Sequence, residues 1–500
     1  MLSTLIWMPL LGTLIVGFLP GNLTTSRLRF IALAIASLIL LVTIGLLSQF
    51  DLATPGLQFQ EYLPWIPQLG LTYNLGVDGL SLPLLALSSL LTWIVIYSSN
   101  GVERSRLYYA LILLVNAAVA GAFVSQNLLL FVIFYELELI PLYLLINIWG
   151  GPKRGYAATK FLIYTAISGV FILAGFLGLT WLSHSTSFDY NSMVAQGLSL
   201  KAQLILLTML LVGFGIKIPL VPLHTWLPDA YTEASPPIAI LLGGVLAKLG
   251  TYGLLRFGLG LFPETWAIVA PGLAIIGTVS VLYGALSAIA QKDIKRMVAY
   301  SSIGHMGYVM LGSAAANSLS LVGTISQMVA HGLILALLFH LVGVIESKVG
   351  TRELDVLNGL LNPIRGLPLT TSLLILAGMA SAGIPGLVGF ISEFLVFQGS
   401  YSVFPLLTIL CVVGTGLTAV YFVILLNRTC FGKLDNYEAY YPKVNGQERL
   451  PALILAAIIF ILGVQPNWLV RWSETTSTAM IAAVTTTQQV AINPPASVEN

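Results

Sequence analysis

Residues 126–149 read QNLLLFVIFYELELIPLYLLINIW, a continuous apolar run interrupted by two carboxylates and by no basic residue. An α-helix needs about 20 apolar residues to cross a hydrocarbon core of ~30 Å, and this run has that length. The whole chain is similarly apolar and poor in charge. Of all residues, 57% are hydrophobic and 8% are charged, whereas about 25% are charged in soluble proteins. We therefore predict an integral membrane protein.

Runs of the same kind recur along the chain and predict an all-α membrane fold with about fourteen transmembrane helices. Their continuity excludes a transmembrane β-barrel, whose strands alternate apolar and polar residues. The first run is not a cleaved signal peptide, since it lacks a basic flank and an A-x-A-like site. The predicted helices cover residues 2–19, 30–48, 77–97, 107–124, 126–149, 158–183, 201–222, 236–258, 265–288, 297–314, 320–345, 370–398, 404–427 and 450–467.

The basic residues predict the orientation of these helices. In the loops or near the helix ends, one side holds only Lys201, Arg256 and Arg471. Cytoplasmic loops of membrane proteins are enriched in Lys and Arg, so we expect both termini on the outer or lumenal side. The opposite, basic side carries Arg27, Arg29, Arg104, Arg106, Lys153, Arg154, Lys160, Lys292, Lys295, Arg296, Lys348, Arg352, Arg365, Arg428, Lys433, Lys443 and Arg449.

The chain shows no motif for a cofactor of its own. Cys411 and Cys430 form neither a C-x-x-C pair nor an iron–sulfur spacing. A P-loop and a dinucleotide-binding fingerprint are both missing from the sequence. We expect no nucleotide, metal or redox centre in this chain, and we expect lipids and other membrane proteins, not nucleic acid, as its partners.

Two predicted helices contain helix-breaking residues, in GFGIKIPLVPLHTWLP (residues 213–228) and in SAGIPGLVGFISEF (residues 381–394). Such breaks survive in lipid only where protein, polar groups or water satisfy the freed backbone. Each is the fourth helix of a set of five, helices 4–8 and 9–13, which is typical of a transport site built on repeats. The predicted divisions are 1–106 (helices 1–3), 107–260 (first repeat), 261–428 (second repeat), 429–475 (inner loop and helix 14) and 476–500 (C-terminal tail).

Three segments outside the helices have their own predictions. Residues 49–76 are interpreted as an ordered outer loop, because aromatics and prolines accompany Asp51 and Glu61. Residues 428–449 form either a surface for partner docking or a solvated connection. The tail after residue 476 is interpreted as a small surface segment followed by disorder.

Four ionisable residues lie well inside the predicted helices: Glu136, Lys217, Lys248 and Glu393. A charge at the bilayer centre costs at least ~2.5–3.5 kcal/mol on insertion scales, so four unrelated accidents are improbable. One interpretation is that acids and bases pair only to hold helices together. The other is a proton relay, in which opening or closing a Glu136–Lys217 ion pair changes whether Lys217 keeps its proton.

Glu138 is the less certain carboxylate of its helix. It lies two residues from Glu136, or about 200° around a helix, so the two cannot share a face. We expect Glu138 to contact a neighbouring subunit or a polar group at the lipid edge, with a place in the relay as the alternative.

The histidines add candidates, because imidazole can pass a proton between its two nitrogens near neutral pH. The alternative for each is a neutral, hydrogen-bonded core histidine. A relay role is favoured for His331, is possible for His305 and is doubtful for His340. His224, near Asp229 and Glu233, marks either a proton entry mouth or an interfacial turn. No acid or cysteine stands at ligand spacing, so a metal site is not expected.

Taken together and in order, these segments resemble the antiporter-like subunits of respiratory complex I and of photosynthetic NADH dehydrogenase-like complexes. ELELIP and the acid at Glu393 are similar to the subunit 4 (NuoM/NdhD) branch, because subunit 2 and 5 relatives commonly have lysine where this chain has Glu393. The segments that carry the resemblance are FYELELIPLYLLI, IKIPLVPLHTWLPDAYTEAS, LAKLGTYGLLRF, KDIKRMVAYSSIGHMGY, MVAHGLILALLFHL and GIPGLVGFISEF, between about residues 126 and 398.

The resemblance implies a proton-translocating subunit of an NAD(P)H or ferredoxin:quinone oxidoreductase. It implies two inverted repeats that each form a half-channel, and a relay through Glu136, Lys217, Lys248, His331 and Glu393. His305 would be a further bridging histidine. Quinone, iron–sulfur clusters and NAD(P)H or ferredoxin would bind elsewhere in the complex, beside neighbouring antiporter-like and small membrane subunits. The ELEL form favours a cyanobacterial or plastid thylakoid membrane over a bacterial inner membrane.

Two other functions stay open. A free-standing subunit of a multi-subunit cation/proton antiporter would share the buried charges, but it needs a sodium-binding cluster of acids that the second half lacks. A structural membrane scaffold would use the charges as inert links between helices. The scaffold predicts that neutralising Glu136 prevents assembly and leaves pumping unaffected in whatever assembles.

Overall fold

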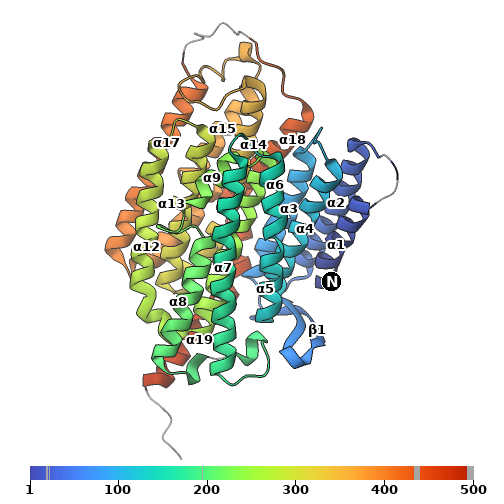
Figure 1. The fold of residues 1–500 in the computed structure, drawn as a ribbon. Helices are drawn as coiled ribbons and strands as arrows, with labels where there is room; N and C mark the ends of the chain where they lie inside the picture. Colours follow the sequence, from blue (N-terminus) through green and yellow to red (C-terminus); the bar gives the residue numbers. More distant parts are fainter. Residues whose placement is uncertain (19–20, 22, 194, 433–439, 493–500) are drawn as a thin grey trace, which may run out of the picture.

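A computed structural model describes residues 1–18, 21, 23–193, 195–432 and 440–492 of the chain. Figure 1 shows most of the helices running side by side, with the first two at one edge of the bundle and a small β-hairpin projecting at one end. Within the described residues, 11 helices are long and apolar enough to cross a membrane. The chain is therefore a helical, multi-pass membrane protein.

The first half of the chain begins with two helices, the hairpin and a densely packed group of further helices. Its elements are α1 (Leu2–Phe18), α2 (Thr25–Gln49), β1 (Gln58–Ile66), β2 (Leu71–Val77), α3 (Ser81–Ser98), α4 (Ser105–Val124), α5 (Leu128–Leu137), α6 (Leu139–Trp149), α7 (Arg154–Leu182), α8 (Leu200–Lys217), α9 (Trp226–Glu233), α10 (Pro236–Leu241), η4 (Leu242–Leu246), α11 (Ala247–Gly253) and η5 (Leu254–Leu259).

The regular elements of the second half, in its described part, are all helices. Its elements are α12 (Pro263–Ile289), α13 (Ile294–Ala315), α14 (Ser318–Val349), α15 (Pro368–Ser381), α16 (Val388–Tyr401), α17 (Pro405–Cys430), α18 (Gly446–Val464) and α19 (Asn467–Ile492).

Burial separates central helices from peripheral ones. In α14, 94% of the most apolar window is buried, and in Pro236–Leu259 the whole window is buried. In α2 and α17 the corresponding shares are 28% and 33%, and their outward faces expose apolar side chains such as Phe30 and Val423. Exposed apolar faces suit a lipid environment, because lipid tails are as apolar as the side chains that meet them. The buried histidines of α14 and the buried Lys248 of residues 236–259 therefore lie at the centre of the bundle.

Both predicted helix breaks occur. The helix predicted over 201–222 ends at Lys217, and the chain resumes as α9 after a short irregular segment. The helix predicted over 370–398 is divided into α15 and α16. In each case proline and glycine interrupt the backbone ladder, and a charged residue lies at or near the break: Lys217 closes α8, and Glu393 lies in the second turn of α16.

The helix predicted over 236–258 is present but not regular. Two segments of this helix, η4 and η5, are π-helical and therefore wider than an α-helix. A π-helix bonds residue i to i+5 and often appears as a single widened turn at functional sites. This widening lies immediately before Lys248, the buried lysine of the segment.

Two predictions outside the helices need correction. The outer loop predicted over 49–76 contains an antiparallel hairpin of β1 and β2; Pro64 within β1 hides the strand from sequence patterns because proline is confined to edge strands. The tail is not a short surface segment, since α19 continues to Ile492. Residues 493–500 and residues 433–439, the middle of the loop considered for docking, lie outside the described residues.

A buried ion pair joins the hairpin to the central helices. The Asp78 carboxylate at the end of β2 lies 2.5 Å from the guanidinium of Arg256 in η5, and both side chains are buried. Asp78 also accepts hydrogen bonds from the backbone of Leu80 and Ser81, where α3 begins. The Asp78 carboxylate therefore holds the end of β2, the start of α3 and η5 together.

Arg256→Ala is expected to destabilise the protein by about 3–5 kcal/mol, because it leaves the Asp78 carboxylate buried without a partner. Thermal unfolding of the purified assembly in mild detergent measures the effect as a lower melting temperature. The control is Arg428→Ala, which removes an ion pair with Asp355 whose side chains are about half exposed and which should change little. Equal melting temperatures for the two variants would contradict this assignment.

Candidate proton-transfer site

The first buried pair is formed by Lys217 and Glu138. Lys217 Nζ lies 2.5 Å from Glu138 Oε1, and the side chains are 1% and 0% exposed. The ammonium also lies 4.3 Å from the ring centroid of Tyr135, within cation–π range. Tyr135 is held in place because its hydroxyl contacts Ser168, which in turn donates to the Gly213 carbonyl of α8.

The partner of Lys217 differs from the prediction. Glu138 meets the lysine, whereas Glu136 packs against the backbone of Gly169 in α7 and is only half-buried. The two carboxylates do point to different faces, as predicted, but the assignment of the faces was wrong. The reason is tertiary: the whole segment is apolar, so its sequence does not show which side faces α8.

The break between α5 and α6 lies at Glu138. Pro141 has no backbone N–H, so the carbonyl of Leu137 loses its intrahelical partner and the helix is interrupted there. This interruption places Glu138 between two helical segments, where its side chain reaches the end of α8.

Lys248 is held by neutral groups. Its Nζ lies 2.5 Å from the Gly243 carbonyl oxygen in η4 and 2.8 Å from His331 Nδ1 in α14. The π-helical turn makes the first contact possible, because it frees a carbonyl five residues before the lysine from the normal helical ladder. Among the described residues, Lys248 has no carboxylate within ion-pairing distance.

His331 continues the contacts towards α13. With its Nδ1 accepting from Lys248, its ring stands 5.3 Å, centroid to centroid, from the ring of His305. His331 Nε2 is buried and has no hydrogen-bond partner among the residues that the structure describes. A buried polar atom normally has a protein or water partner, so this nitrogen marks the place where a bridging group would join the two imidazoles.

His305 connects this contact to Glu393. Its Nδ1 lies 3.4 Å from Glu393 Oε1 and 3.3 Å from the amide Nε2 of Gln327. A neutral imidazole with a free Nδ1 accepts from the Gln327 amide, whereas a protonated Nδ1 donates to Glu393. Nε2 lies 2.9 Å from the Ser381 hydroxyl, which can donate to or accept from it. The geometry therefore lets His305 change partners with its proton.

Glu393 is the last group of the connected set. Its second oxygen accepts from the Thr415 hydroxyl at 3.2 Å, and Thr415 also contacts the Tyr308 hydroxyl at 3.0 Å. The sequence-based reasoning missed Gln327, Ser381 and Thr415. Of these only Gln327 carried a signal, as a polar residue one helical turn before His331 on α14.

The structure thus places Lys248, His331, His305 and Glu393 in one buried line that runs from α11 in the first half of the chain through α14 and α13 to α16 in the second half. The Lys217–Glu138 pair stands apart from that line. The pair and the line are connected only by packing among the described residues. Lys217 packs closely against Gly250, two residues after Lys248, because its Cβ would lie 3.1 Å from a Cβ added at that glycine.

The remaining candidates lie elsewhere. His224 is buried against the ring of Tyr283, 4.7 Å between centroids, and no contact joins it to the buried line among the described residues. Asp229 pairs with Lys160 and Arg296. His340 Nε2 lies 2.8 Å from the Glu448 carbonyl oxygen. Within the described part of the chain, no three His, Cys, Asp or Glu side chains are grouped as a metal site would require.

A bundle of apolar helices with broken members and buried ionisable side chains is typical of ion-translocating membrane proteins. The chain belongs to the family described as "NADH:quinone oxidoreductase/Mrp antiporter, TM", whose sequence pattern matches residues 125–418. This confirms the resemblance drawn from the sequence.

Curated relatives cover nearly the whole chain. It is 40% identical over 495 residues to "NAD(P)H-quinone oxidoreductase chain 4 1" of Synechococcus elongatus, covering 97% of this chain and 92% of that one. It is 37% identical over 497 residues to "NAD(P)H-quinone oxidoreductase chain 4" of Acaryochloris marina, covering 97% and 92%.

Solved structures share the fold. A chain of respiratory complex I from Thermus thermophilus superposes with a TM-score of 0.87 at 27% identity, covering 97% of this chain and all of that one. A chain of the Mrp complex from Dietzia sp. superposes with a TM-score of 0.86 at 20% identity, covering 98% of each chain.

Proposed function

We propose that this chain is the proton-translocating membrane subunit of an NAD(P)H-quinone oxidoreductase complex. The observation that carries the proposal is the buried line of Lys248, His331, His305 and Glu393, in which every member can hold or release a proton. The relatives of Synechococcus elongatus and Acaryochloris marina bear the name of such a complex over nearly the whole chain.

The proton path starts at the two buried lysines. Lys217 keeps its proton while the Glu138 carboxylate lies against it, and releases it towards Lys248 when that pair opens. Lys248 exchanges its proton with His331 without separating an ion pair, because only neutral groups surround its Nζ. From His331 the proton passes to His305 and then to Glu393, as the partner change of His305 allows.

Glu136 has a different role from Glu138 in this scheme. It is half-buried, and Ile133 and Ile140 on the same side of the helices are exposed. We place Glu136 at the contact with a neighbouring membrane subunit, where a change of charge alters the electrostatic balance of Lys217. Glu138 thus takes the position beside Lys217 that was first expected for Glu136, and Glu136 takes the subunit contact first expected for Glu138. Both carboxylates remain in the proposed coupling path.

The architecture proposed for this function has fourteen membrane spans and two inverted repeats, residues 107–260 and 261–428. The two breaks support it, because each lies beside one ionisable residue, Lys217 in the first repeat and Glu393 in the second. Residues 1–106, 429–475 and 476–500 complete the chain. The distribution of Lys and Arg supports termini on the lumenal or outer side.

The surroundings follow from the same proposal. The names of the cyanobacterial relatives favour a thylakoid membrane. Electron transfer from NAD(P)H or ferredoxin to quinone, with its iron–sulfur clusters, takes place in other subunits. Neighbouring antiporter-like and small membrane subunits and lipids are the direct partners.

His305→Gln tests the proposal, because glutamine keeps hydrogen bonding but cannot carry a proton. Redox-driven proton uptake into vesicles is expected to fall at least ~10-fold, equivalent to a barrier increase of about 1.4 kcal/mol. The control, His184→Gln, changes an exposed histidine and should pump normally. Undiminished pumping by assembled His305→Gln complexes would refute the path, and sodium-dependent proton flux without quinone reduction would instead identify a cation/proton antiporter.

A further inference from the structure

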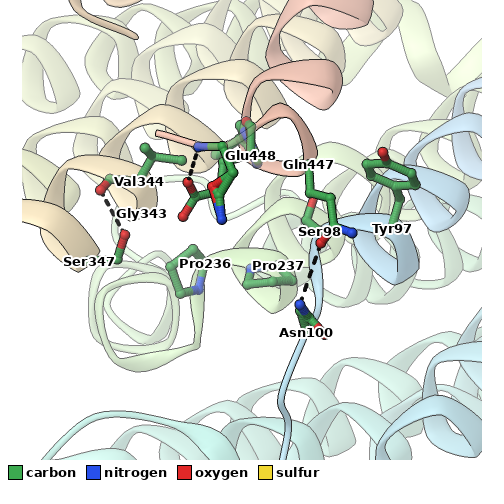
Figure 2. Close-up of a pocket in the computed structure, with 12 residues that line it drawn as sticks. Tyr97, Ser98, Asn100, Pro236, Pro237, Gly343, Val344, Ser347, Gln447 and Glu448 are labelled. Carbon is green, nitrogen blue, oxygen red and sulfur yellow. Dashed lines mark hydrogen bonds between the residues drawn. The ribbon is translucent and has the colours of Figure 1, made fainter. Parts of the chain in front are cut away.

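A polar cavity of about 260 Å³ lies at the end of the bundle where α3 ends and α10 and α18 begin. Figure 2 shows its lining, with Asn100 and Gln447 on one side and Ser347 and Glu448 on another. Pro236 forms part of its floor in the same view. The lining is rich in hydroxyl, amide and carboxylate groups, which are the partners that retain water in a cavity of this size.

One stripe of α14 leads from this cavity to the proton-transfer site. Ser347, Gly343, Phe339, Leu335 and His331 follow one another at four-residue spacing, so they form one oblique ridge that turns around α14 by about 40° at each step. Pro236 of α10 packs against this ridge at Gly343, where an added Cβ would overlap the proline ring. Ser347 and Gly343 line the cavity, and His331 binds Lys248. The stripe spans roughly 24 Å at 1.5 Å per residue, and its two middle members are apolar.

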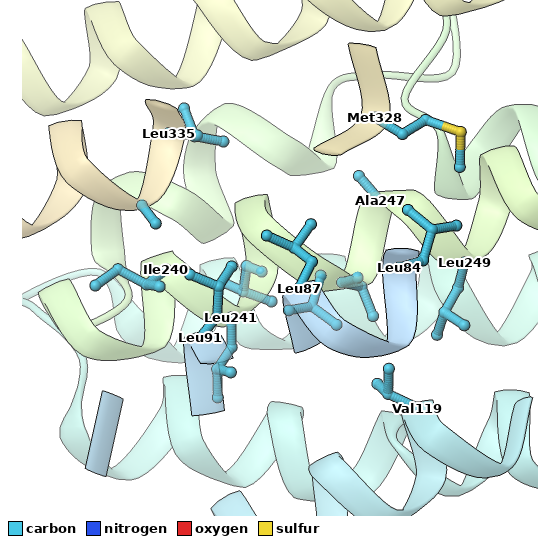
Figure 3. Packing of buried hydrophobic residues seen from close by; sticks show 14 of the residues in the cluster. Leu84, Leu87, Leu91, Val119, Ile240, Leu241, Ala247, Leu249, Met328 and Leu335 are labelled. Carbon is cyan, nitrogen blue, oxygen red and sulfur yellow. The ribbon is translucent and has the colours of Figure 1, made fainter. Parts of the chain in front are cut away.

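Those middle members, together with Leu91, pack against the two glycines of η4. Leu335 and Phe339 lie so close to the backbone of Gly243 that an added Cβ would overlap Leu335 and stand 3.2 Å from Phe339. Leu91 of α3 is equally close to Gly244, where an added Cβ would overlap it. Leu91, Leu335 and Phe339 are at most 1% exposed. Figure 3 draws Leu91 close to Leu241, with Ile240 and Leu335 among the other buried apolar side chains of this region. Gly243, whose carbonyl binds Lys248, lies against Leu335 and Phe339.

We propose that Leu91, Leu335 and Phe339 form a hydrophobic gate between a water-filled vestibule and the Lys248–His331 pair. When the three side chains are packed, the layer they form excludes water and no proton crosses it. When they separate, water enters and brings protons from the vestibule to the two buried lysines, Lys217 and Lys248, at which the proposed path starts. The inference rests on the proposed function. A barrier is required there, because Lys248 is already connected through His331 and His305 to Glu393, and continuous water would short-circuit the gradient.

Cysteine labelling tests the vestibule and the gate separately, in the assembled complex in vesicles, with a small charged thiol reagent that does not cross membranes. Ser347→Cys is expected to react, and Leu335→Cys in an otherwise unchanged chain is not. Combining Leu335→Cys with Leu91→Ser should raise its labelling rate at least ~10-fold by admitting water. Leu337→Cys is the control, since it is equally buried on the same helix but off the stripe.

The native Cys411 and Cys430 are buried, and the unsubstituted complex supplies the labelling background. An unreactive Ser347→Cys would overturn the vestibule. Labelling of Leu335→Cys as fast as that of Ser347→Cys, without Leu91→Ser, would overturn the gate.

Proton leakage gives the functional test. Leu91→Ser is expected to raise passive proton entry into vesicles at least ~10-fold without any electron donor, and adding Lys248→Met should remove the increase. The control is Leu85→Ser, a fully buried leucine on another face of α3. If Lys248→Met alone leaves pumping intact, the proposed function fails; if it stops pumping but Leu91→Ser causes neither leak nor labelling, only the gate fails.

Discussion

Replacing Lys217 by methionine is expected to lower redox-driven proton uptake by about 100-fold while the complex still assembles. Methionine has nearly the same length but cannot hold a proton, so a charge would have to pass this depth without a carrier. An uncompensated charge at the bilayer centre costs at least ~2.5–3.5 kcal/mol, and a barrier higher by about 2.7 kcal/mol gives a 100-fold loss. Assembly survives because Glu138, left without its partner, can take up a proton and become neutral.

The measurement compares proton uptake into vesicles with quinone reduction by the same preparation, and blue-native electrophoresis reports assembly. A double-mutant cycle then tests which carboxylate acts on the lysine. Glu138→Gln should couple to Lys217→Met by at least ~1.5 kcal/mol, within the range for residues in direct contact, because the two side chains lie 2.5 Å apart. Glu136→Gln should couple less strongly. A stronger coupling of Glu136 would show that the ion pair is not the functional one.

The second large effect is expected at Lys248. Lys248→Met should also reduce proton uptake about 100-fold by the same reasoning on barrier height, since it removes the group that exchanges protons with His331. Lys248→Arg tests whether the positive charge alone is sufficient. A guanidinium keeps the charge but stays protonated at any physiological pH, so it cannot release a proton. We therefore expect Lys248→Arg to fail in pumping as well, although it preserves the positive charge.

The Lys248→Arg variant distinguishes a proton-relay role of Lys248 from a purely structural role in which it links helices. If Lys248 only held α14 in place, Lys248→Arg would restore pumping and Lys248→Met would lower the melting temperature of the complex. Lys201→Met is the control, as an exposed lysine at the start of α8, and should leave both readouts unchanged.

The membrane class, the two helix breaks and the burial of Lys217, Lys248 and Glu393 were predictable from the sequence. These features are local: a run of about 20 apolar residues, a proline and a lone charge each have a large free-energy consequence wherever they stand. The family was recognisable for the same reason, because the segments around Lys217 and Lys248 keep their order and spacing. The hairpin and the length of α19 were not predictable, since Pro64 obscures the strand and α19 lacks the charge-poor apolar run that marked the other helices.

Contacts between distant segments were decided only by the tertiary structure. The sequence showed that Glu136 and Glu138 face opposite ways, but a helix that is apolar all round carries no periodicity to say which face meets α8. In the same way, nothing local places His305 between His331 and Glu393, because α13, α14 and α16 are far apart along the chain. The sequence by itself determined which side chains lipid would not tolerate alone, and packing alone decided which of them lie beside which.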